Sequence, residues 1–275
     1  MDVQSPQGKV SAWLASFEKA LAARDMAALT ELFAPECYWR DLIAFTWNIK
    51  TMEGREAIAE MAGATLANVN PRNFAVEGPV SENAGRQEAF FTFDTDTMNG
   101  KGHIRLGDDG AFTLLTTGQS LKGFEEKTGP TRDMGVAHGV HTDRETWAEA
   151  RAREEAELGI TRQPYALIIG GGQGGIALGA RLKRIGVPTL IIEKNPRAGD
   201  SWRNRYKSLC LHDPVWYDHL PYLPFPDHWP VFSPKDKLGD WLESYVKLME
   251  LNYWVKSTCK SASYDEAAGE WTVVV

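Results

Sequence analysis

The segment from Gly170 to Gly175 most constrains how this chain can fold, because five of its six residues are glycines. Glycine loses more conformational freedom on folding than any other residue, so such a run weakens any helix or strand that contains it. The apolar stretch YALII (165–169) precedes the run, and apolar residues at helical spacing follow it. A second apolar stretch, TLIIE, comes after Pro188 and ends at Glu193. This order predicts a buried strand, a glycine turn, a helix and a second buried strand.

The layout is typical of a dinucleotide-binding unit, in which each glycine has a physical task. Gly170 permits a tight turn, Gly172 lets the backbone approach a pyrophosphate, and Gly175 lets the helix pack closely on the strand. The helix N-terminus, which includes Gly174, presents free N–H groups and a positive dipole end to phosphates. Glu193 ends the second strand, where a carboxylate binds ribose hydroxyls and disfavours a 2′-phosphate. The sequence therefore predicts FAD or NAD rather than NADP at this site, and a purely structural turn is the alternative.

The residues after Glu193 resemble those of the flavin-containing monooxygenases and their relatives, the class B flavoprotein monooxygenases. The resemblance rests on four segments, which are GDSW (199–202), YKSLCLH (206–212), PFP (224–226) and WLESY (241–245). It covers residues 165–275 and is closest to the indole-pyruvate branch, which also has Leu-His at the position of Leu211 and His212. In this family the first glycine fingerprint binds FAD.

The resemblance implies a set of FAD-binding residues but assigns no catalytic residue. The ADP half of FAD would contact Gly170, Gly172, Gly174, Gly175 and Glu193. Lys194 and Arg197 are expected near the adenine or the phosphates, and Trp202 and Arg203 near the flavin. His212 is also expected among the residues that contact the cofactor. His212 replaces an active-site asparagine of the animal-type enzymes, so the role of that asparagine is not carried over. Asp200 stands where the family usually has a second glycine. Core packing is the alternative for Trp202, and surface ion pairs are the alternative for Arg203.

The resemblance also implies a reaction, in which NADPH reduces FAD and oxygen from O₂ passes to a small organic substrate. The chain contains one glycine fingerprint, so we expect it to be the N-terminal part of a longer FAD- and NADPH-dependent monooxygenase and to be inactive alone. Disulfide reductases share the fingerprint, but Cys210 and Cys259 lie too far apart in sequence for their redox pair. A rival hypothesis is a non-catalytic binding or dimerisation module with a vestigial FAD half-domain.

The first part of the chain predicts an α+β domain, because helical spacing of apolar residues gives way to alternation. We expect helices over 10–21, 26–33 and 55–66 and strands over 73–80, 86–97, 101–107 and 111–121. This order resembles the SnoaL-like superfamily, in which three helices and a bent sheet enclose a conical pocket. The expected fold class is a SnoaL-like α+β cone domain over 1–125 and a partial α/β Rossmann-type FAD-binding domain over 164–275.

Residues 126–163 are expected to be a linker that contains a solvated, charged helix. Thr142 and Glu145 have the spacing of a capping box and would open this helix. His138 and His141 with Asp143 could suggest a metal site, but no further ligands lie nearby, so an ordinary loop is favoured and no metal is expected.

Three polar residues of the first domain could line its cone. A buried acid among Asp41 and Asp94, with His103 nearby, could act as an isomerase-type base. The favoured interpretation is that these strand residues face solvent.

Composition sets the expected partners and compartment. A net charge of −7 disfavours nucleic acid and anionic membranes. The sequence has neither a signal peptide nor an apolar run of the ~18 residues that a membrane helix needs. Three dispersed cysteines indicate reduced thiols and a cytoplasmic location. A small-molecule substrate is expected, and a homodimer through the first domain remains open.

Overall fold

A computed structural model describes residues 5–135, 139–140 and 142–275. The chain divides into two compact units, Met1–Glu125 (unit 1) and Glu126–Val275 (unit 2). Within the described ranges, none of the helices combines the length and the apolar character needed to cross a bilayer.

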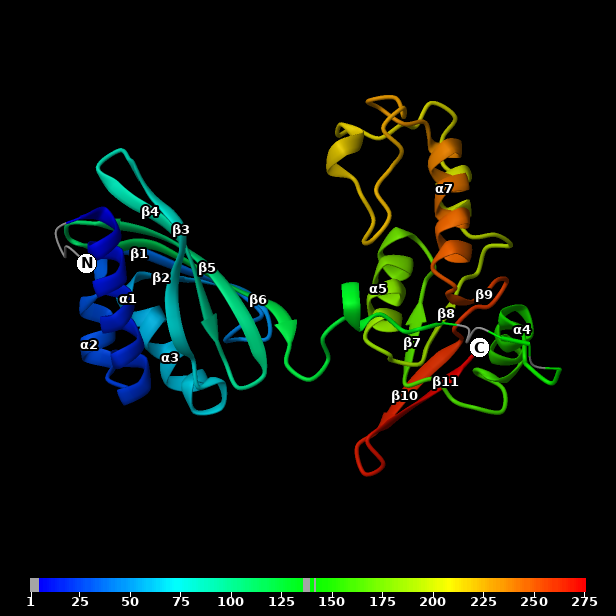
Figure 1. Cartoon of the computed structure of the whole chain (residues 1–275), viewed down its shortest axis with the longest axis horizontal. Coiled ribbons are helices and arrows are strands. Elements are labelled where there is room, and N and C mark those ends of the chain that lie inside the picture. The colour runs from blue at the N-terminus through cyan, green and yellow to red at the C-terminus, as the bar shows by residue number, and fades with distance from the viewer. Residues whose placement is uncertain (1–4, 136–138, 141) are drawn as a thin grey trace. The chain divides into compact units, whose positions relative to one another are not determined.

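Unit 1 is an α+β domain in which three helices pack against a curved sheet of six strands (Figure 1). The helices are α1 (Pro6–Ala23), α2 (Met26–Glu31) and α3 (Gly54–Val69). The strands are β1 (Phe33–Leu42), β2 (Ile49–Glu53), β3 (Arg72–Asn83), β4 (Arg86–Asp94), β5 (Met98–Gly107) and β6 (Gly110–Leu121). They are ordered β2-β1-β6-β5-β4-β3, and only the β1–β6 pair among them is parallel.

Local sequence explains most of these elements. The side chain of Asp25 accepts a hydrogen bond from the Ala28 N–H (3.0 Å) and caps α2. Gly107 and Gly110 pair across the tight hairpin turn that joins β5 to β6. The second helix was expected to run to Phe33, but it ends at Glu31 because Phe33 begins β1. Neither β1 nor β2 was predicted.

The concave side of the unit 1 sheet is filled with aromatic rings. Trp39 and Phe45 lie with ring centroids 4.9 Å apart, and Phe17 lies 5.4 Å from Trp39. All three are buried. The resemblance to SnoaL-like proteins implied a conical pocket here, whereas these rings pack against one another. Packed aromatic rings stabilise the fold through apolar burial and favourable edge-to-face contacts.

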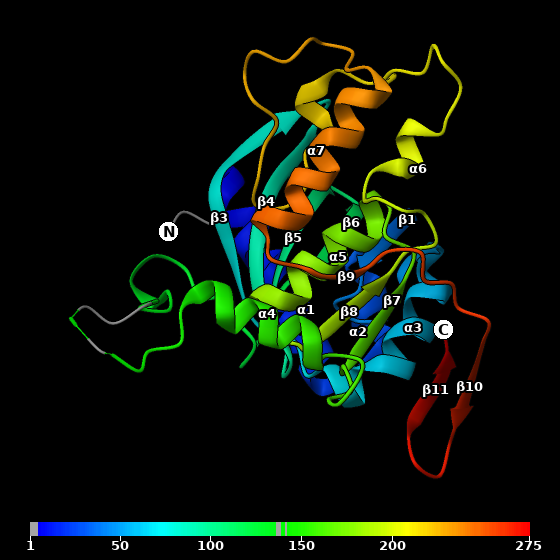
Figure 2. The same cartoon turned by 90° about the vertical axis from the view of Figure 1, so that its right-hand side faces the viewer.

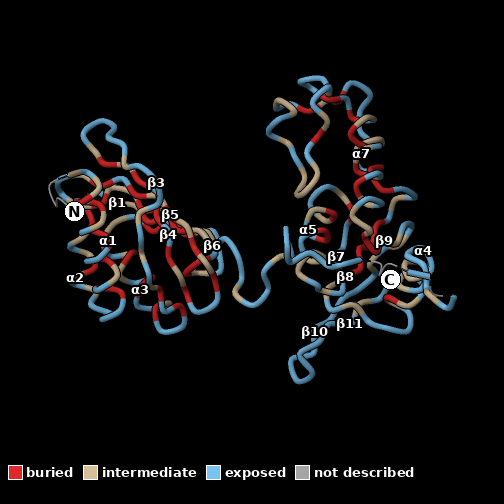
Figure 3. The backbone as a smooth tube through the Cα atoms, in the orientation of Figure 1, coloured by how far each residue is buried: buried red, intermediate tan, exposed pale blue. Residues whose placement is uncertain are grey.

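Unit 2 is built on a parallel three-stranded sheet ordered β7-β8-β9. Its elements are η1 (Gly129–Thr131), α4 (Trp147–Glu157), β7 (Ala166–Ile169), α5 (Gln173–Arg184), β8 (Thr189–Ile192), α6 (Asp200–Arg203), η2 (Val215–Tyr217), α7 (Lys235–Leu248), β9 (Asn252–Trp254), β10 (Ser261–Asp265) and β11 (Glu270–Val274). Figures 1 and 2 both show the β10–β11 hairpin projecting from the body of the unit. The burial map in Figure 3 shows this hairpin to be mostly exposed, whereas α7 has buried residues along its length.

The charged helix begins later than expected. Its cap is Thr146, whose hydroxyl accepts from the Glu149 N–H (3.2 Å), while Glu149 accepts from the Thr146 N–H (2.7 Å). The capping box assigned to Thr142 and Glu145 is therefore wrong. Both pairs have the same spacing and differ by one helical turn, so the local pattern could not separate them.

The same helix also contacts the sheet of unit 2. Asn252 of β9 donates to Glu154 (3.0 Å) and accepts from Arg151 (3.1 Å), and Leu158 after the helix is buried against β8 residues. No residue of α4 itself is fully buried. Thus α4 is solvated as expected, and its polar side chains attach it to the sheet of unit 2.

Candidate functional site

The glycine run forms a turn between β7 and α5, in the order that the sequence predicts. Gly170 has a φ of +106°, which glycine adopts without steric cost, and its N–H donates to the Ile192 carbonyl of β8 (2.9 Å). Gly172 is the N-cap of α5, and the first turn of that helix contains Gly174 and Gly175. The free N–H groups of the helix therefore follow directly from the end of a parallel strand. That arrangement favours anion binding.

The glycines of the turn are required for different reasons. A Cβ on Gly175 would lie 1.9 Å from the Gly170 carbonyl oxygen, so the close packing of helix and strand requires glycine at this position. A Cβ on Gly172 would meet only the Ser201 hydroxyl, at 3.8 Å, and one on Gly174 would meet nothing within 4 Å. The fold itself therefore does not demand glycine at 172 or 174. Their missing side chains leave space beside the helix N-terminus.

Glu193 lies directly after β8 and is only 6% exposed. One of its carboxylate oxygens, Oε2, accepts from the Gly171 N–H (2.8 Å). The other, Oε1, accepts from the Asn195 N–H (2.9 Å) and side-chain amide (2.7 Å). A carboxylate offers about four acceptor positions, so about one remains for a ligand hydroxyl. The structure thus orients Glu193 rigidly toward the glycine turn.

Trp202 is brought to the same turn. Its indole N–H donates to the side-chain carbonyl of Gln173 (2.8 Å), the first residue of α5. Its ring also packs against the apolar cores of unit 2. Both the core-packing role and a position beside the proposed cofactor site are therefore compatible with the structure.

The segment around Trp202 is fixed by a close glycine contact and by the carboxylate of Asp200. Gly199 has a φ of +85°, and its missing Cβ would lie 2.1 Å from the Gly239 carbonyl oxygen of α7. Asp200 accepts from the Arg197 N–H (3.1 Å) and forms an ion pair with Arg203 (3.0 Å). Asp200, which stands where the family usually has a second glycine, therefore ties the start of α6 to the preceding loop and to Arg203.

Arg197 and Arg203 form ion pairs with α7. The Arg203 guanidinium pairs with Asp200, Asp240 (2.8 Å) and Glu243 (2.9 Å), and its side chain is 14% exposed. Arg197 donates to Glu243 (2.7 Å), which lowers the pKa of that carboxyl below its usual value. The ion pairs of Arg203 match the alternative that the sequence analysis gave for that residue, and a contact of either guanidinium with cofactor stays a prediction.

Two other predicted cofactor contacts lie on the surface. Lys194 and His212 are both exposed, and within the described ranges neither side chain has a hydrogen bond or ion pair. The structure therefore ties Glu193 and Trp202 to the glycine turn through Gly171 and Gln173, and it gives Lys194 and His212 no such contact among the described residues.

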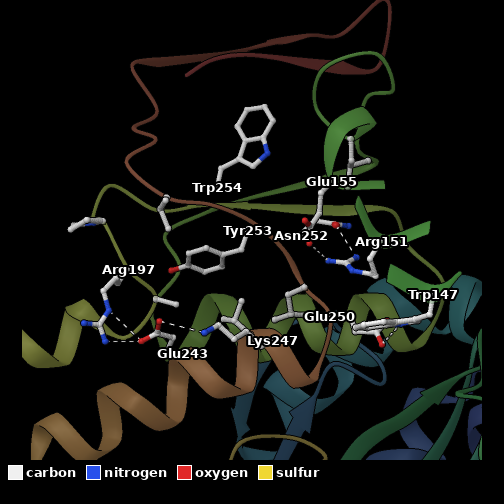
Figure 4. A pocket seen from close by; sticks show the side chains of 16 residues that line it. Trp147, Arg151, Glu155, Arg197, Glu243, Lys247, Glu250, Asn252, Tyr253 and Trp254 are labelled. Carbon is white, nitrogen blue, oxygen red and sulfur yellow. Dashed lines mark hydrogen bonds and ion pairs between the residues drawn. The ribbon is translucent and has the colours of Figure 1, made fainter. Parts of the chain in front are cut away.

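A separate groove of about 500 Å³ runs along the outer edge of β9 between α4 and α7 (Figure 4). Arg197 is the one predicted site residue that lines it. Glu243 lies between Arg197 and Lys247 on the rim (2.7 Å and 3.7 Å). Three cationic side chains in the lining are matched by three acidic ones. The groove therefore has no net charge with which to select a phosphate.

The polar candidates of unit 1 do not form a site. Asp41 is fully buried, so the expectation that it faces solvent is wrong. Its carboxylate accepts hydrogen bonds from the Phe45 and Thr46 N–H groups and from the Thr46 and Thr116 hydroxyls (2.7–3.0 Å). Four donors saturate this carboxylate, which therefore stabilises the loop after β1.

The other two candidates in unit 1 also have partners of their own. His103 packs edge-on against Phe90 with ring centroids 4.8 Å apart, and Asp94 binds the Asn73 amide (2.9 Å) and Lys122 (3.4 Å). Of the metal-site candidates in the linker, His138 and His141 lie outside the described residues. Among the residues that the structure does describe, no three His, Cys, Asp or Glu side chains form a metal-binding cluster.

Sequence reasoning missed four residues that contact the turn. Gly171 binds Glu193, Gln173 binds Trp202, Asn195 binds Glu193, and Tyr253 donates from β9 to the Gly171 carbonyl. Gly171 and Gln173 lie inside the glycine run, so their place in the motif could have drawn attention to them. Tyr253 gives no local signal, because its partner is distant in sequence.

Comparison with known proteins relates the two units to different groups. Residues 13–144 match the SnoaL-like domain family, which supports the predicted fold of unit 1. The chain is 41% identical over 108 residues to the probable indole-3-pyruvate monooxygenase YUCCA3 of Arabidopsis thaliana, covering 39% of this chain and 25% of that protein. It is 35% identical over 123 residues to indole-3-pyruvate monooxygenase YUCCA1 of Oryza sativa subsp. japonica, covering 44% and 30%.

The solved flavin-containing monooxygenase from Stenotrophomonas maltophilia aligns with 39% of this chain and 35% of its own, with a TM-score of 0.36 and 22% identity. That similarity is too low to support a conclusion. The chain spans about a quarter to a third of the length of the curated relatives it matches. The matches to those relatives establish homology with flavin-dependent monooxygenases over part of the chain.

Proposed function

We propose that unit 2 binds the ADP half of FAD at the turn between β7 and α5, as part of a flavin-dependent monooxygenase. One observation carries this proposal. The N-terminus of α5, with two glycines that the fold does not require, lies next to a buried carboxylate at the end of the adjacent parallel strand. Homology to proteins named as indole-3-pyruvate monooxygenases supports the choice of FAD over NAD.

The residues of the turn fit the chemistry of this cofactor. The free N–H groups of α5 would bind the pyrophosphate, and the space at Gly172 would admit it. The remaining acceptor position of Glu193 would take one ribose hydroxyl, and its charge would repel a 2′-phosphate. Trp202, held by Gln173, would border the site. When bound and reduced, the flavin supplies the activation of O₂.

The activity of the whole protein belongs to the same proposal. NADPH would supply the hydride, and a small organic molecule would receive one oxygen atom. Unit 1 would act as an interaction module, because aromatic rings fill the side of its sheet where a ligand pocket was expected. We propose homodimerisation as that interaction. The three cysteines are free thiols, which supports a reducing, cytoplasmic compartment.

A Gly172→Val substitution separates the proposed site from the fold. Because a Cβ here meets only one atom within 4 Å, the variant should unfold at nearly the temperature of the wild type. It should nevertheless lose FAD, since its side chain occupies the pyrophosphate space. The matched control is Gly63→Val in unit 1, where a Cβ meets nothing within 4 Å. FAD titration by flavin fluorescence tests this, and unchanged affinity in Gly172→Val would place the cofactor elsewhere.

A further inference from the structure

Tyr253 contacts the glycine turn from the third strand of the sheet. It lies on β9, and its hydroxyl donates to the Gly171 carbonyl oxygen at 2.9 Å. The Gly171 N–H, on the other side of the same residue, donates to Glu193 (2.8 Å). Gly171 is therefore held at both of its peptide groups, one by a tyrosine and one by the carboxylate of the proposed ribose site.

The ring of Tyr253 also explains why residue 171 is a glycine. A Cβ built on Gly171 would lie 2.0 Å from the Tyr253 hydroxyl oxygen and 2.3 Å from the adjacent ring carbon. Gly170 differs, because its φ of +106° requires glycine although no atom lies within 4 Å of its missing Cβ. Gly171 has no positive φ, so the neighbouring ring is what excludes a side chain there. Two adjacent glycines thus serve unrelated purposes.

From these contacts we propose that Tyr253 is a positioning residue for the cofactor site. It fixes the conformation of Gly171 and thereby the direction of Glu193 and of the α5 N-terminus. The inference rests on the proposed function. Figure 4 shows Tyr253 projecting from β9, and neither strand pairing nor the glycine motif accounts for its hydroxyl contact.

The surroundings of Tyr253 keep it a hydrogen-bond donor. Partial burial and the nearby negative charges of Glu193 and Asp200 raise its pKa above the ordinary value for tyrosine. The phenol therefore stays protonated throughout the neutral range and donates to the Gly171 carbonyl. Phenylalanine at this position would retain the ring and remove only the donor.

Two measurements test the proposal. Tyr253→Phe should weaken FAD binding by roughly threefold to tenfold, the loss expected for one neutral hydrogen bond. Tyr264→Phe is the matched control, because this half-exposed tyrosine lies on β10 and makes no contact with Gly171. The Tyr264→Phe variant should bind FAD as tightly as the wild type. Equal FAD affinity in Tyr253→Phe and the wild type overturns the positioning role.

The second measurement needs no cofactor. Gly171→Ala should lower the unfolding temperature of the FAD-free protein in the wild-type background. It should lower that temperature much less in a Tyr253→Val background, where the ring no longer occupies the space. If Gly171→Ala does not fold, recovery of folding in the double variant supports the contact. An equal drop in unfolding temperature in both backgrounds, or a double variant that still does not fold, overturns the proposed contact.

These outcomes separate the inference from the proposed function. A wild-type chain that binds no FAD refutes the proposed function, and with it the role of Tyr253 toward the cofactor. A wild-type chain that binds FAD, together with a Tyr253→Phe variant that binds equally well, refutes only the inference.

Discussion

Gly175→Ala is the substitution for which the structure gives the most definite cost. The added Cβ would lie 1.9 Å from the Gly170 carbonyl oxygen, a backbone atom that cannot rotate away. Strand β7 and helix α5 would have to separate by roughly 1 Å or more, in a region packed at the density of a crystal. Overpacking of this kind costs about 1–3 kcal/mol, and the rigidity of the partner atom places the value in the upper part of that range.

The neighbouring Gly174→Ala variant is the matched control. Its Cβ would meet nothing within 4 Å, and alanine is a better helix former than glycine by up to ~1 kcal/mol. For a folding unit of this size, 1 kcal/mol corresponds to roughly 2–4 °C in the unfolding midpoint. We therefore expect Gly175→Ala to lower the midpoint of unit 2 by roughly 5–10 °C and Gly174→Ala to leave it unchanged or slightly raised.

Differential scanning calorimetry of the intact chain, without added cofactor, is the assay. The transition of unit 1 should be the same in all three proteins and serves as the internal reference. Equal midpoints for Gly175→Ala and Gly174→Ala would refute the reasoning, because the two glycines would then have the same structural role.

Three further predictions concern charged groups. Glu193→Gln should weaken FAD binding by about 1–1.5 kcal/mol in a fluorescence titration, the difference between a charge-assisted and a neutral hydrogen bond to ribose, and unchanged affinity would remove Glu193 from the ribose site. Asp41→Ala should destabilise unit 1 by about 3 kcal/mol or more in urea unfolding, because buried donors lose their acceptor, whereas the control Asp108→Ala, at an exposed carboxylate, should change little. Burial lowers the pKa of His103 in the folded protein below its unfolded pKa of about 6.5. The stability that the neutral imidazole contributes is therefore fully present above the unfolded pKa, and it is lost as the pH falls through the pKa of the folded state. Urea midpoints between pH 8 and 5 should therefore fall more in the wild type than in His103→Gln, and parallel pH profiles would contradict this.

The parts of this protein that could be predicted from sequence depend on residues close together in the chain. The turn at Gly170–Gly175 follows from apolar periodicity and glycine content, and Asp25 caps α2 through a donor only three residues away. Asp41 was misjudged because its burial depends on Thr116, which lies across the sheet in β6. The contact between Gly171 and Tyr253 joins the turn after β7 to β9, and it leaves no local sequence pattern.

Strand β1 was missed for a related physical reason. It contains a proline and an irregularity in its register with β6, so its burial does not alternate cleanly. Its pairing with the distant β6, rather than its own propensity, holds it in the sheet. The ion pairs of Arg197 and Arg203 with α7 likewise depend on packing that sequence spacing alone could not determine.

The central claim, that unit 2 holds the ADP half of FAD, is tested most directly by calorimetric titration of the intact chain with fragments of the cofactor. The account predicts that ADP binds by itself, because the α5 N-terminus and Glu193 supply contacts to its phosphates and ribose. Adenosine 2′,5′-bisphosphate should bind much more weakly because of the Glu193 carboxylate, and FMN, which lacks the adenosine, should not compete with ADP. Gly172→Val should abolish the ADP signal without changing the unfolding temperature. A chain that binds FMN as tightly as ADP, or that prefers the 2′-phosphate, would contradict the assignment.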